Sequence, residues 1–289
     1  MDINTFTSTI AAHAQSADNA APNPDLRLWS DPAAGLECYY APFDYVNAEA
    51  KIVLIGITPG RTQMNRSLNA AAETLRRGTP LGAALRGVKR EGSFGGDMRK
   101  PLVELLNKLG YARTLGISCA SRLWHDCDDL VHFCSLLKYP VFYKGSDYNS
   151  TPKIIGNARL MEMVKTHFVG DLMKLPKDAV LLPLGETVLE VLVHLSKQGV
   201  IPQNLMKWQD EYVAIPHPSG QNGETVALVL QDQFQTLDSY VDSKYRSYLE
   251  ARAWLRKGRS APQSPEIYRG KRATYWQSAR RVRLAHGLA

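Results

Sequence analysis

The sequence is short of the features that mark disulfide-rich, secreted and membrane proteins. It has four cysteines (38, 119, 127 and 134) and no C-x-x-C pair, which favours reduced thiols over disulfides or a metal site. No apolar run reaches the roughly 20 residues that a membrane span requires, and the N-terminus lacks the basic start of a secretory signal. We therefore expect a cytoplasmic monomer that uses no metal and no cofactor and does not contact a membrane.

Positive charge is present but concentrated at one end of the chain. The net charge is +7, yet residues 243–289 hold 12 of the 35 Lys and Arg and only two acids, so this segment is +10 and the rest is −3. Six aromatic residues lie among these charges: Tyr245, Tyr248, Trp254, Tyr268, Tyr275 and Trp276. Such a mixture suits a polyanion, because Lys and Arg meet phosphates while rings stack on bases. A solvated helical face whose aromatic rings pack on the core is the alternative.

The rest of the chain alternates strand-like and helix-like segments. The predicted strands are 51–56, 114–120, 130–137, 179–185 and 211–220, and the predicted helices are 67–77, 95–110, 156–175 and 186–199. This alternation predicts an α/β fold, a three-layer α/β/α sandwich with a central, mainly parallel sheet. We divide the chain into this domain, residues 1–242, and a basic helical extension packed on it, residues 243–289. Residues 86–100 are expected to form a mobile surface loop, and residues 15–24 an irregular link.

Two rigid turns follow predicted strands that are far apart in the sequence. "GITPG" (56–60) follows the first strand and "HPSG" (217–220) follows the last. In open parallel sheets, ligands bind beyond the carboxyl ends of the strands. The sequence therefore predicts that both turns face a common pocket. By contrast, "WHDCDD" (124–129) matches no standard metal-ligand spacing, and we expect a solvated turn there.

The two turns together resemble the uracil-DNA glycosylase superfamily. Its members carry a Gly-x-(Asp/Asn/Ala)-Pro-(Gly/Tyr) loop early in the chain and a (His/Asn)-Pro-Ser-(Gly/Pro) loop late. Three intervening segments are also similar and fall in the family's order: "GSFGGDMRKPLVELLNKLG", "HFCSLLKYP" and "AVLLPLGETVLEVL". The resemblance covers residues 50–230 and implies the sandwich fold, DNA as the partner, and hydrolysis of the bond between a flipped-out base and its deoxyribose.

The resemblance gives catalytic roles to two residues. His217 matches the family histidine that donates a hydrogen bond to O2 of the leaving pyrimidine, which stabilises the developing negative charge; a loop histidine bonded to backbone is the alternative. Thr58 stands where relatives often have an Asp or Asn that orients the attacking water. A hydroxyl can hold a water but is a poor base at neutral pH, so Thr58 either positions the water or only satisfies the turn.

The other matched positions would hold the base and the DNA backbone. Phe94 matches the aromatic ring that stacks on the flipped base, and Ser135 falls where the family usually has an Asn that reads the pyrimidine edge. Asp147, with Tyr148 and Asn149, is a candidate to compensate for that missing amide, and a solvated loop is the alternative. The turn expected to approach the base through its backbone is Gly56, Ile57, Pro59 and Gly60. The loop expected to grip DNA phosphate is Ser219, Gly220 and Gln221.

The departures from the family pattern suggest the substrate. Thr58, Ser135 and Gln221 lie in the predicted pocket or at its rim, and smaller side chains at reading positions make room for a substituent on the base. We therefore expect a modified pyrimidine rather than plain uracil, such as hydroxymethylated or glucosylated cytosine of phage DNA excised in host defence. A uracil-DNA glycosylase of base excision repair and a catalytically inactive nucleic-acid-binding relative are the alternatives. The +10 segment disfavours a nucleoside hydrolase, because a free nucleoside would not need it.

Overall fold

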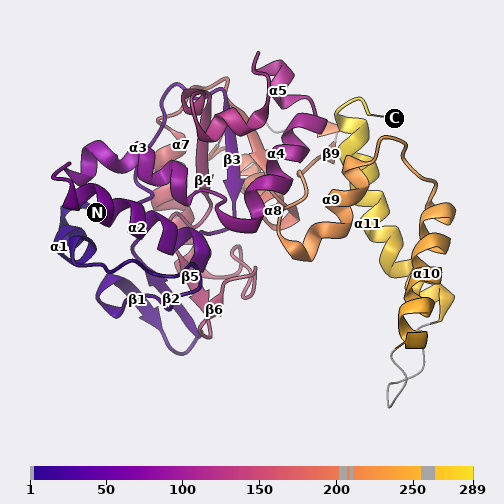
Figure 1. Cartoon of the computed structure of the whole chain (residues 1–289), viewed down its shortest axis with the longest axis horizontal. Coiled ribbons are helices and arrows are strands. Elements are labelled where there is room, and N and C mark those ends of the chain that lie inside the picture. Colours follow the sequence, from indigo (N-terminus) through magenta and orange to yellow (C-terminus); the bar gives the residue numbers. More distant parts are fainter. Residues whose placement is uncertain (1–2, 202–206, 209–210, 255–263, 289) are drawn as a thin grey trace.

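The computed structural model describes residues 3–201, 207–208, 211–254 and 264–288 (Figure 1). At its centre is a parallel sheet with the strand order β4-β3-β7. The strands are β3 (Ile52–Gly56), β4 (Val131–Ser135) and β7 (Val180–Pro183). Alternate side chains of β3 enter different cores, since Val53 and Ile55 belong to one buried cluster and Ile52 and Leu54 to the other. This period of two on a fully apolar strand is what a sheet covered on both faces requires.

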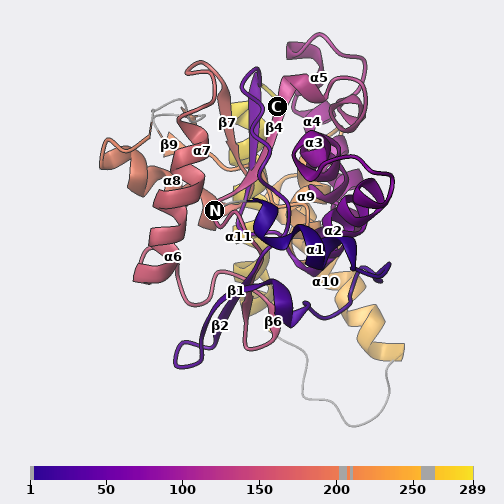
Figure 2. The same ribbon diagram turned by 90° about the vertical axis from the view of Figure 1, so that its left-hand side faces the viewer.

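Helices lie on both sides of this sheet, so the predicted three-layer sandwich is confirmed. Figure 2 shows α6, α7 and α8 on one side and α3, α4, α5 and α9 on the other. The helices are α1 (Thr7–Ala11), α2 (Arg61–Arg76), α3 (Leu81–Gly92), α4 (Arg99–Lys108), α5 (Tyr111–Thr114), α6 (Ala158–Met163), α7 (Gly170–Leu172), α8 (Glu186–Lys197) and α9 (Gly223–Leu230), and a π-helical segment, Val164–Val169, joins α6 to α7. The α4 helix shows why these segments fold as they do. Leu102, Leu105 and Leu106 form one buried face, and Gly110 follows with a φ of 85° that ends the helix.

A second, antiparallel sheet was not predicted. It has the order β1-β2-β5-β6, with β1 (Arg27–Asp31), β2 (Leu36–Tyr39), β5 (Val141–Tyr143) and β6 (Ser146–Asp147). In Figure 1 it lies on the side toward which β3 points. The carboxyl ends of the central strands therefore face this small sheet, and β5 and β6 follow directly after β4 in the chain.

The basic extension is helical and is not separated from the α/β domain. It contains most of α10 (Leu237–Trp254) and all of α11 (Pro265–Ala285), so the division predicted at residue 242 falls inside α10. Residues 255–263 and 289 of the extension lie outside the described residues. The α11 helix packs on α9, and its Ala279 and Val282 are buried in the second core cluster. Thus α11 completes the core of the α/β domain.

Three local predictions were wrong. Residues 114–120 form no strand; the chain there leaves the short helix α5 and enters a 3₁₀ turn at Ala120–Trp124. The segment 86–100, expected to be a mobile loop, is mostly helical: residues 86–92 end α3, a 3₁₀ turn spans Gly96–Met98, and α4 begins at Arg99. Its Val88 and Lys89 are buried. The strand predicted at 211–220 is reduced to a two-residue strand, β9 (Glu211–Tyr212), paired with β8 (Lys207–Trp208), and to one parallel bridge between Ile215 and Leu184. Proline on both sides of His217 removes the backbone donors that a longer strand would need.

The acidic turn at 124–129 is a turn, but it is only partly solvated. Trp124 is buried, and Asp128 accepts hydrogen bonds from Arg86 at 2.5 Å and from Arg90 at 3.1 Å. Among the described residues, no group of His, Cys, Asp and Glu side chains is arranged to hold a metal ion. None of the helices in the described ranges combines the length and apolarity needed to cross a bilayer.

Candidate functional site

The two predicted turns lie at the same edge of the central sheet. Gly56 ends β3 and pairs with Ser135 at the end of β4. On the other side of β3, the backbone N–H of Gly185, just after β7, donates to the carbonyl of Ile215 at 2.8 Å. An ideal Cβ on Gly185 would lie 3.4 Å from the Cβ of His217. The loop that carries His217 is therefore next to the end of β7, and β7 is next to β3.

A third loop joins these two turns. The Asp147 carboxylate accepts hydrogen bonds from the backbone N–H of Arg61, the first residue of α2, at 3.2 Å. A Cβ on Gly60 would lie only 2.8 Å from an Asp147 oxygen, so glycine is needed at this position for the loop to fit. The side-chain amide of Asn149 donates to Gln221 at 3.0 Å. Asp147 is thus exposed and binds the start of α2, and the rim residue Gln221 bonds to Asn149.

Thr58 is tied to the backbone rather than turned to a cavity. Its hydroxyl donates to the carbonyl of Tyr139 at 3.1 Å and accepts from the backbone N–H of Val141 at 3.1 Å. Nearby, the carbonyls of Gly56 and Ile57 accept the N–H groups of the residues that follow β4. These bonds clamp the first turn onto the β4–β5 connection. They match the alternative in which Thr58 satisfies the turn.

His217 is held as a neutral hydrogen-bond donor. The backbone N–H of Ser219 donates to Nδ1 of His217 at 3.3 Å. Since Nδ1 accepts, the proton of the neutral ring is on Nε2. Burial lowers the pKa of His217 to about 4, so the ring is uncharged at neutral pH. In the same loop, Ser219 Oγ accepts from Asn222 at 3.3 Å, and Gly220 is exposed.

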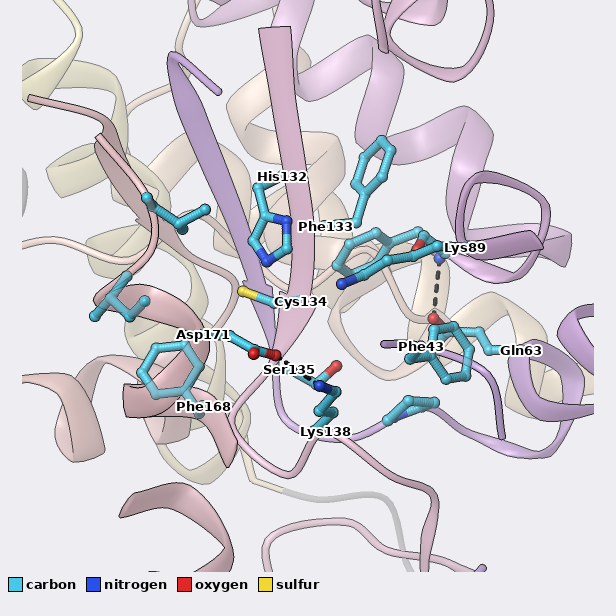
Figure 3. A pocket seen from close by; sticks show the side chains of 15 residues that line it. Phe43, Gln63, Lys89, His132, Phe133, Cys134, Ser135, Lys138, Phe168 and Asp171 are labelled. Atoms are coloured by element: carbon cyan, nitrogen blue, oxygen red, sulfur yellow. Dashed lines mark hydrogen bonds and ion pairs between the residues drawn. The ribbon is translucent and has the colours of Figure 1, made fainter. Parts of the chain in front are cut away.

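A cavity opens at the ends of β3 and β4 and runs along β4, which is the edge strand of the central sheet. The empty space between its lining atoms is about 490 Å3 when the part open to solvent is included, but the centre of a water molecule can occupy only about 20 Å3 of it. Its outer end is formed by Pro59, Phe94 and Ser135, three of the residues predicted to bind the base. Its inner end is formed by Lys89, His132 and Cys134, as Figure 3 shows. Neither His217 nor Thr58 lines this cavity, although both of their turns lie at its edge of the sheet.

Phe94 is held in position by an unusual backbone conformation and by the packing of its ring. Its φ is 49°, an unusual value for a bulky residue, and its backbone N–H donates to the Gln63 side chain at 2.9 Å. Its ring packs edge-on against Phe133 with centroids 6.1 Å apart. A Cβ on Gly56 would lie 3.4 Å both from this ring and from Ser135 Oγ. Phe94 is therefore a core residue as well as a wall of the cavity.

Charged side chains flank the middle of the cavity. The Lys138 ammonium lies 2.8 Å from Asp171 and 3.4 Å from Asp44, and all three side chains are nearly buried. Asp44 also accepts hydrogen bonds from Tyr139 at 2.7 Å and from Tyr40 at 2.9 Å. Lys138 and Asp171 line the cavity, and the pair is drawn in Figure 3. Neither residue was predicted as part of the site, because only tertiary packing brings α7 to the end of β4.

The aromatic residues of the extension pack internally where their side chains are described. Tyr268 is buried, and the Trp276 ring stacks on Phe234 with centroids 5.4 Å apart. Several cations of α11 are also paired within the protein, for example Arg269 with Asp238. A groove on α11 nevertheless keeps Arg280 at the surface. The packed-helix alternative thus describes these aromatic rings.

The comparisons with known proteins give one relative that shows the family of the chain. The uncharacterized protein YoxB of Bacillus subtilis (strain 168) is 32% identical to it over 229 residues, which cover 77% of this chain and 83% of YoxB. The α/β/α protein described here therefore belongs to the same family as YoxB. No family model matches the chain, and no solved structure matches it.

Proposed function

We propose that this protein is a DNA glycosylase of the uracil-DNA glycosylase type that acts on a modified pyrimidine. One observation carries the proposal: Phe94, Pro59 and Ser135, which match base-binding positions of that superfamily, meet in one cavity at the carboxyl ends of β3 and β4. The His217 loop lies at the same sheet edge, beside β7. Neighbouring strands are about 5 Å apart, so the ends of β7 and β4 are separated by about 10 Å. A flipped nucleobase can span that distance.

The proposed chemistry uses His217 as a neutral donor. Departure of the base leaves negative charge on its carbonyl oxygen O2, and a fixed N–H at that position stabilises the transition state. The Ser219 N–H fixes the ring with its proton on Nε2, and burial keeps the ring uncharged. Water then attacks C1′ of the sugar, which leaves an abasic site in DNA. The Thr58 hydroxyl is held by its two backbone bonds, so Thr58 holds the turn and is not assigned to that water.

The substrate class follows from the small residues of the cavity. Ser135 offers a hydroxyl in place of the larger amide that would read a pyrimidine edge, and the cavity continues past it along β4. Space beyond the base edge supports a substituted pyrimidine, such as hydroxymethylated or glucosylated cytosine of phage DNA in host defence, over uracil. The narrowness of the gaps between side chains means that some of them must move when a base enters.

A nucleic-acid-binding protein without catalysis is the second candidate, and Thr58 favours it. The hydroxyl at the water-orienting position is already tied to two backbone groups, and the Asp147 carboxylate is engaged by the backbone N–H of Arg61 at the start of α2. Such a protein would bind DNA and leave every base in place.

The test is cleavage of duplexes that each hold one defined base. Duplexes with uracil, hydroxymethyluracil, hydroxymethylcytosine or glucosylated hydroxymethylcytosine are incubated with the full chain, and abasic sites are cut with alkali and counted. Faster cleavage of a modified pyrimidine supports the proposal. Preference for uracil would place the enzyme in base excision repair, and absence of abasic sites from all duplexes, together with DNA binding, would leave the non-catalytic candidate.

A further inference from the structure

We propose that the inner end of the cavity is a subsite for an oxygen-bearing substituent of the base, held by hydrogen bonds from Lys89 and His132. The proposal rests on the proposed function and specifies its substrate class. It follows from two buried donors that face the same space without enough acceptors. Lys89 lies outside the segments on which the superfamily resemblance is based, and His132, although it begins the segment "HFCSLLKYP", has no role assigned by that resemblance.

His132 offers a donor with no partner. The residue lies in the middle of β4 and is 1% exposed. The backbone N–H of Asn47 donates to its Nδ1 at 3.3 Å, so the ring proton is on Nε2. That Nε2 is buried and has no hydrogen-bond partner within the described residues. Burial, with the positive charges of Lys89 and Lys138, keeps the pKa of His132 well below its ordinary value, and the ring remains a neutral donor.

Lys89 offers a cation with spare protons. It is 4% exposed, and its ammonium donates to the carbonyl of Tyr45 at 2.5 Å. An ammonium has three protons, and no carboxylate of the described residues lies within ion-pair distance of this one. In Figure 3 the ammonium points into the space beside His132 and Cys134. Leaving such a group unpaired in the interior is costly, so an acceptor from a ligand would be bound strongly there.

The other charged groups of the cavity do not supply that acceptor. Asp171 is engaged by Lys138 at 2.8 Å and by Lys174 at 3.2 Å, and the buried Cys134 has a pKa raised to about 12, so it is a neutral thiol. The uncompensated donors therefore lie past Ser135, on the path that a substituent takes when the base itself stacks beneath Phe94. A hydroxyl or a carboxylate oxygen satisfies them, whereas a methyl group does not.

The experiment measures binding by the full chain with the His217→Ala substitution, so that chemistry does not consume the DNA. Dissociation constants are compared for duplexes holding methylcytosine, hydroxymethylcytosine, glucosylated hydroxymethylcytosine or carboxylcytosine. We expect an oxygenated base to bind about tenfold tighter than methylcytosine, because hydrogen bonds to a charged donor are worth that much. A larger gain for carboxylcytosine identifies an anion as the preferred group, and a larger gain for the hydroxylated bases identifies a hydroxyl.

When Lys89→Met is added to the His217→Ala chain, the ratio of the dissociation constants for methylcytosine and for the oxygenated base should fall close to one. Lys174→Met is the matched control, because Lys174 is paired with the cavity residue Asp171 but does not itself line the cavity. Since Lys89 also holds the Tyr45 carbonyl, His132→Phe provides an independent variant, with folding of both checked by thermal denaturation. Equal binding of methylated and oxygenated bases, or an unchanged ratio in the folded variants, overturns the subsite. Failure of the proposed function differs, because the wild-type chain would then form no abasic site in any duplex.

Discussion

Two histidines mark the two ends of the candidate site, and their surroundings differ. His217 and His132 each accept a backbone N–H at Nδ1, and each therefore presents a neutral Nε2–H. His217 sits in a proline-flanked loop at the end of the sheet, half-buried, where a ligand approaching the sheet edge can reach it. His132 is enclosed within β4.

The difference lies in how each end is supported. At the His217 end, Thr58, Asp147 and Asn149 use their polar groups to fix turns to one another. At the His132 end, Lys89 and His132 retain donors that the fold does not satisfy. A site that reacts needs rigid geometry, and a site that selects needs unsatisfied groups which only the right ligand completes. The two ends thus suit catalysis and selection respectively.

If the His217 end is the catalytic one, replacement of His217 should have the largest effect of the substitutions considered, a loss of cleavage rate. His217→Ala is expected to slow abasic-site formation by about 100- to 1,000-fold, because it removes the donor to the leaving base. Single-turnover cleavage of the best modified duplex measures it. His125→Ala, at an exposed histidine of the acidic turn, is the matched control and should cleave at the wild-type rate. Wild-type cleavage by His217→Ala would remove catalysis from this end of the site.

Lys89 predicts a pH dependence of stability at the other end. Burial lowers its pKa from 10.5 to about 8, with the charge of Lys138 acting in the same direction and those of Asp171 and Asp44 opposing it. Between pH 8 and pH 10.5 the unfolded chain holds more protons at this group, so raising the pH through this window stabilises the fold by about 3 kcal/mol. Below pH 8 the contribution is constant.

Chemical denaturation of the wild type and of Lys89→Met at pH 7, 8, 9 and 10 isolates the contribution of Lys89 to the free energy of unfolding. The free energy of unfolding of the wild type should gain on that of the variant as the pH rises from 8 to 10, while the difference stays flat from 7 to 8. The other ionisable groups titrate in the same way in both proteins, so their contributions cancel in the difference between the two free energies of unfolding. A constant difference across the whole range would mean that Lys89 is not a buried cation.

The contrast also shows what the sequence could and could not predict. The sandwich fold was predictable, because the apolar run of β3 and the leucine spacing of α4 are local patterns that tertiary structure preserves. The turns at 56–60 and 217–220 were predictable for the same reason, since proline and glycine constrain the backbone locally. Lys89 was assigned to a mobile loop, because its glycine-, arginine- and lysine-rich segment hides a helical face with Leu81, Leu85 and Val88 buried.

The inner end of the cavity could not be predicted from local patterns. Its groups come from α3 and β4, which are distant in sequence and meet only through packing. The sequence contained one indication of it, because His132 is a histidine in the middle of the apolar predicted strand "LVHFCSLL". The antiparallel sheet was missed because its edge strands β1 and β6 contain no buried residue and carry no apolar run like that of the fully buried β3.

A variant of Thr58 tests whether the backbone hydrogen bonds of its hydroxyl fix the turn at residues 56–60. Thr58→Val keeps the shape of the side chain but removes the hydroxyl, which leaves the Tyr139 carbonyl and the Val141 N–H without that partner. We expect the free energy of unfolding to fall by about 2 kcal/mol. Thr58→Ser is the matched control and should retain most of the stability. Cleavage per folded molecule should change little in either variant, and a loss comparable to that of His217→Ala would instead assign the attacking water to Thr58.

Ser135 joins the two ends, and enlarging it should shift selection without stopping catalysis. Ser135→Asn adds an amide beside Phe94 and Gly56, where the Oγ is already 3.4 Å from a Cβ built on the glycine. The amide can pair with the edge of a pyrimidine and narrows the path to Lys89 and His132. We therefore expect the ratio of cleavage rates for modified base over uracil to fall by about tenfold, the scale of one hydrogen-bonding contact in a pocket. Competition between the two duplexes in one reaction measures this ratio directly. Ser135→Ala, which removes the hydroxyl but keeps the space, should leave the preference for the modified base in place, and equal ratios in all three proteins would show that the substituent does not pass Ser135.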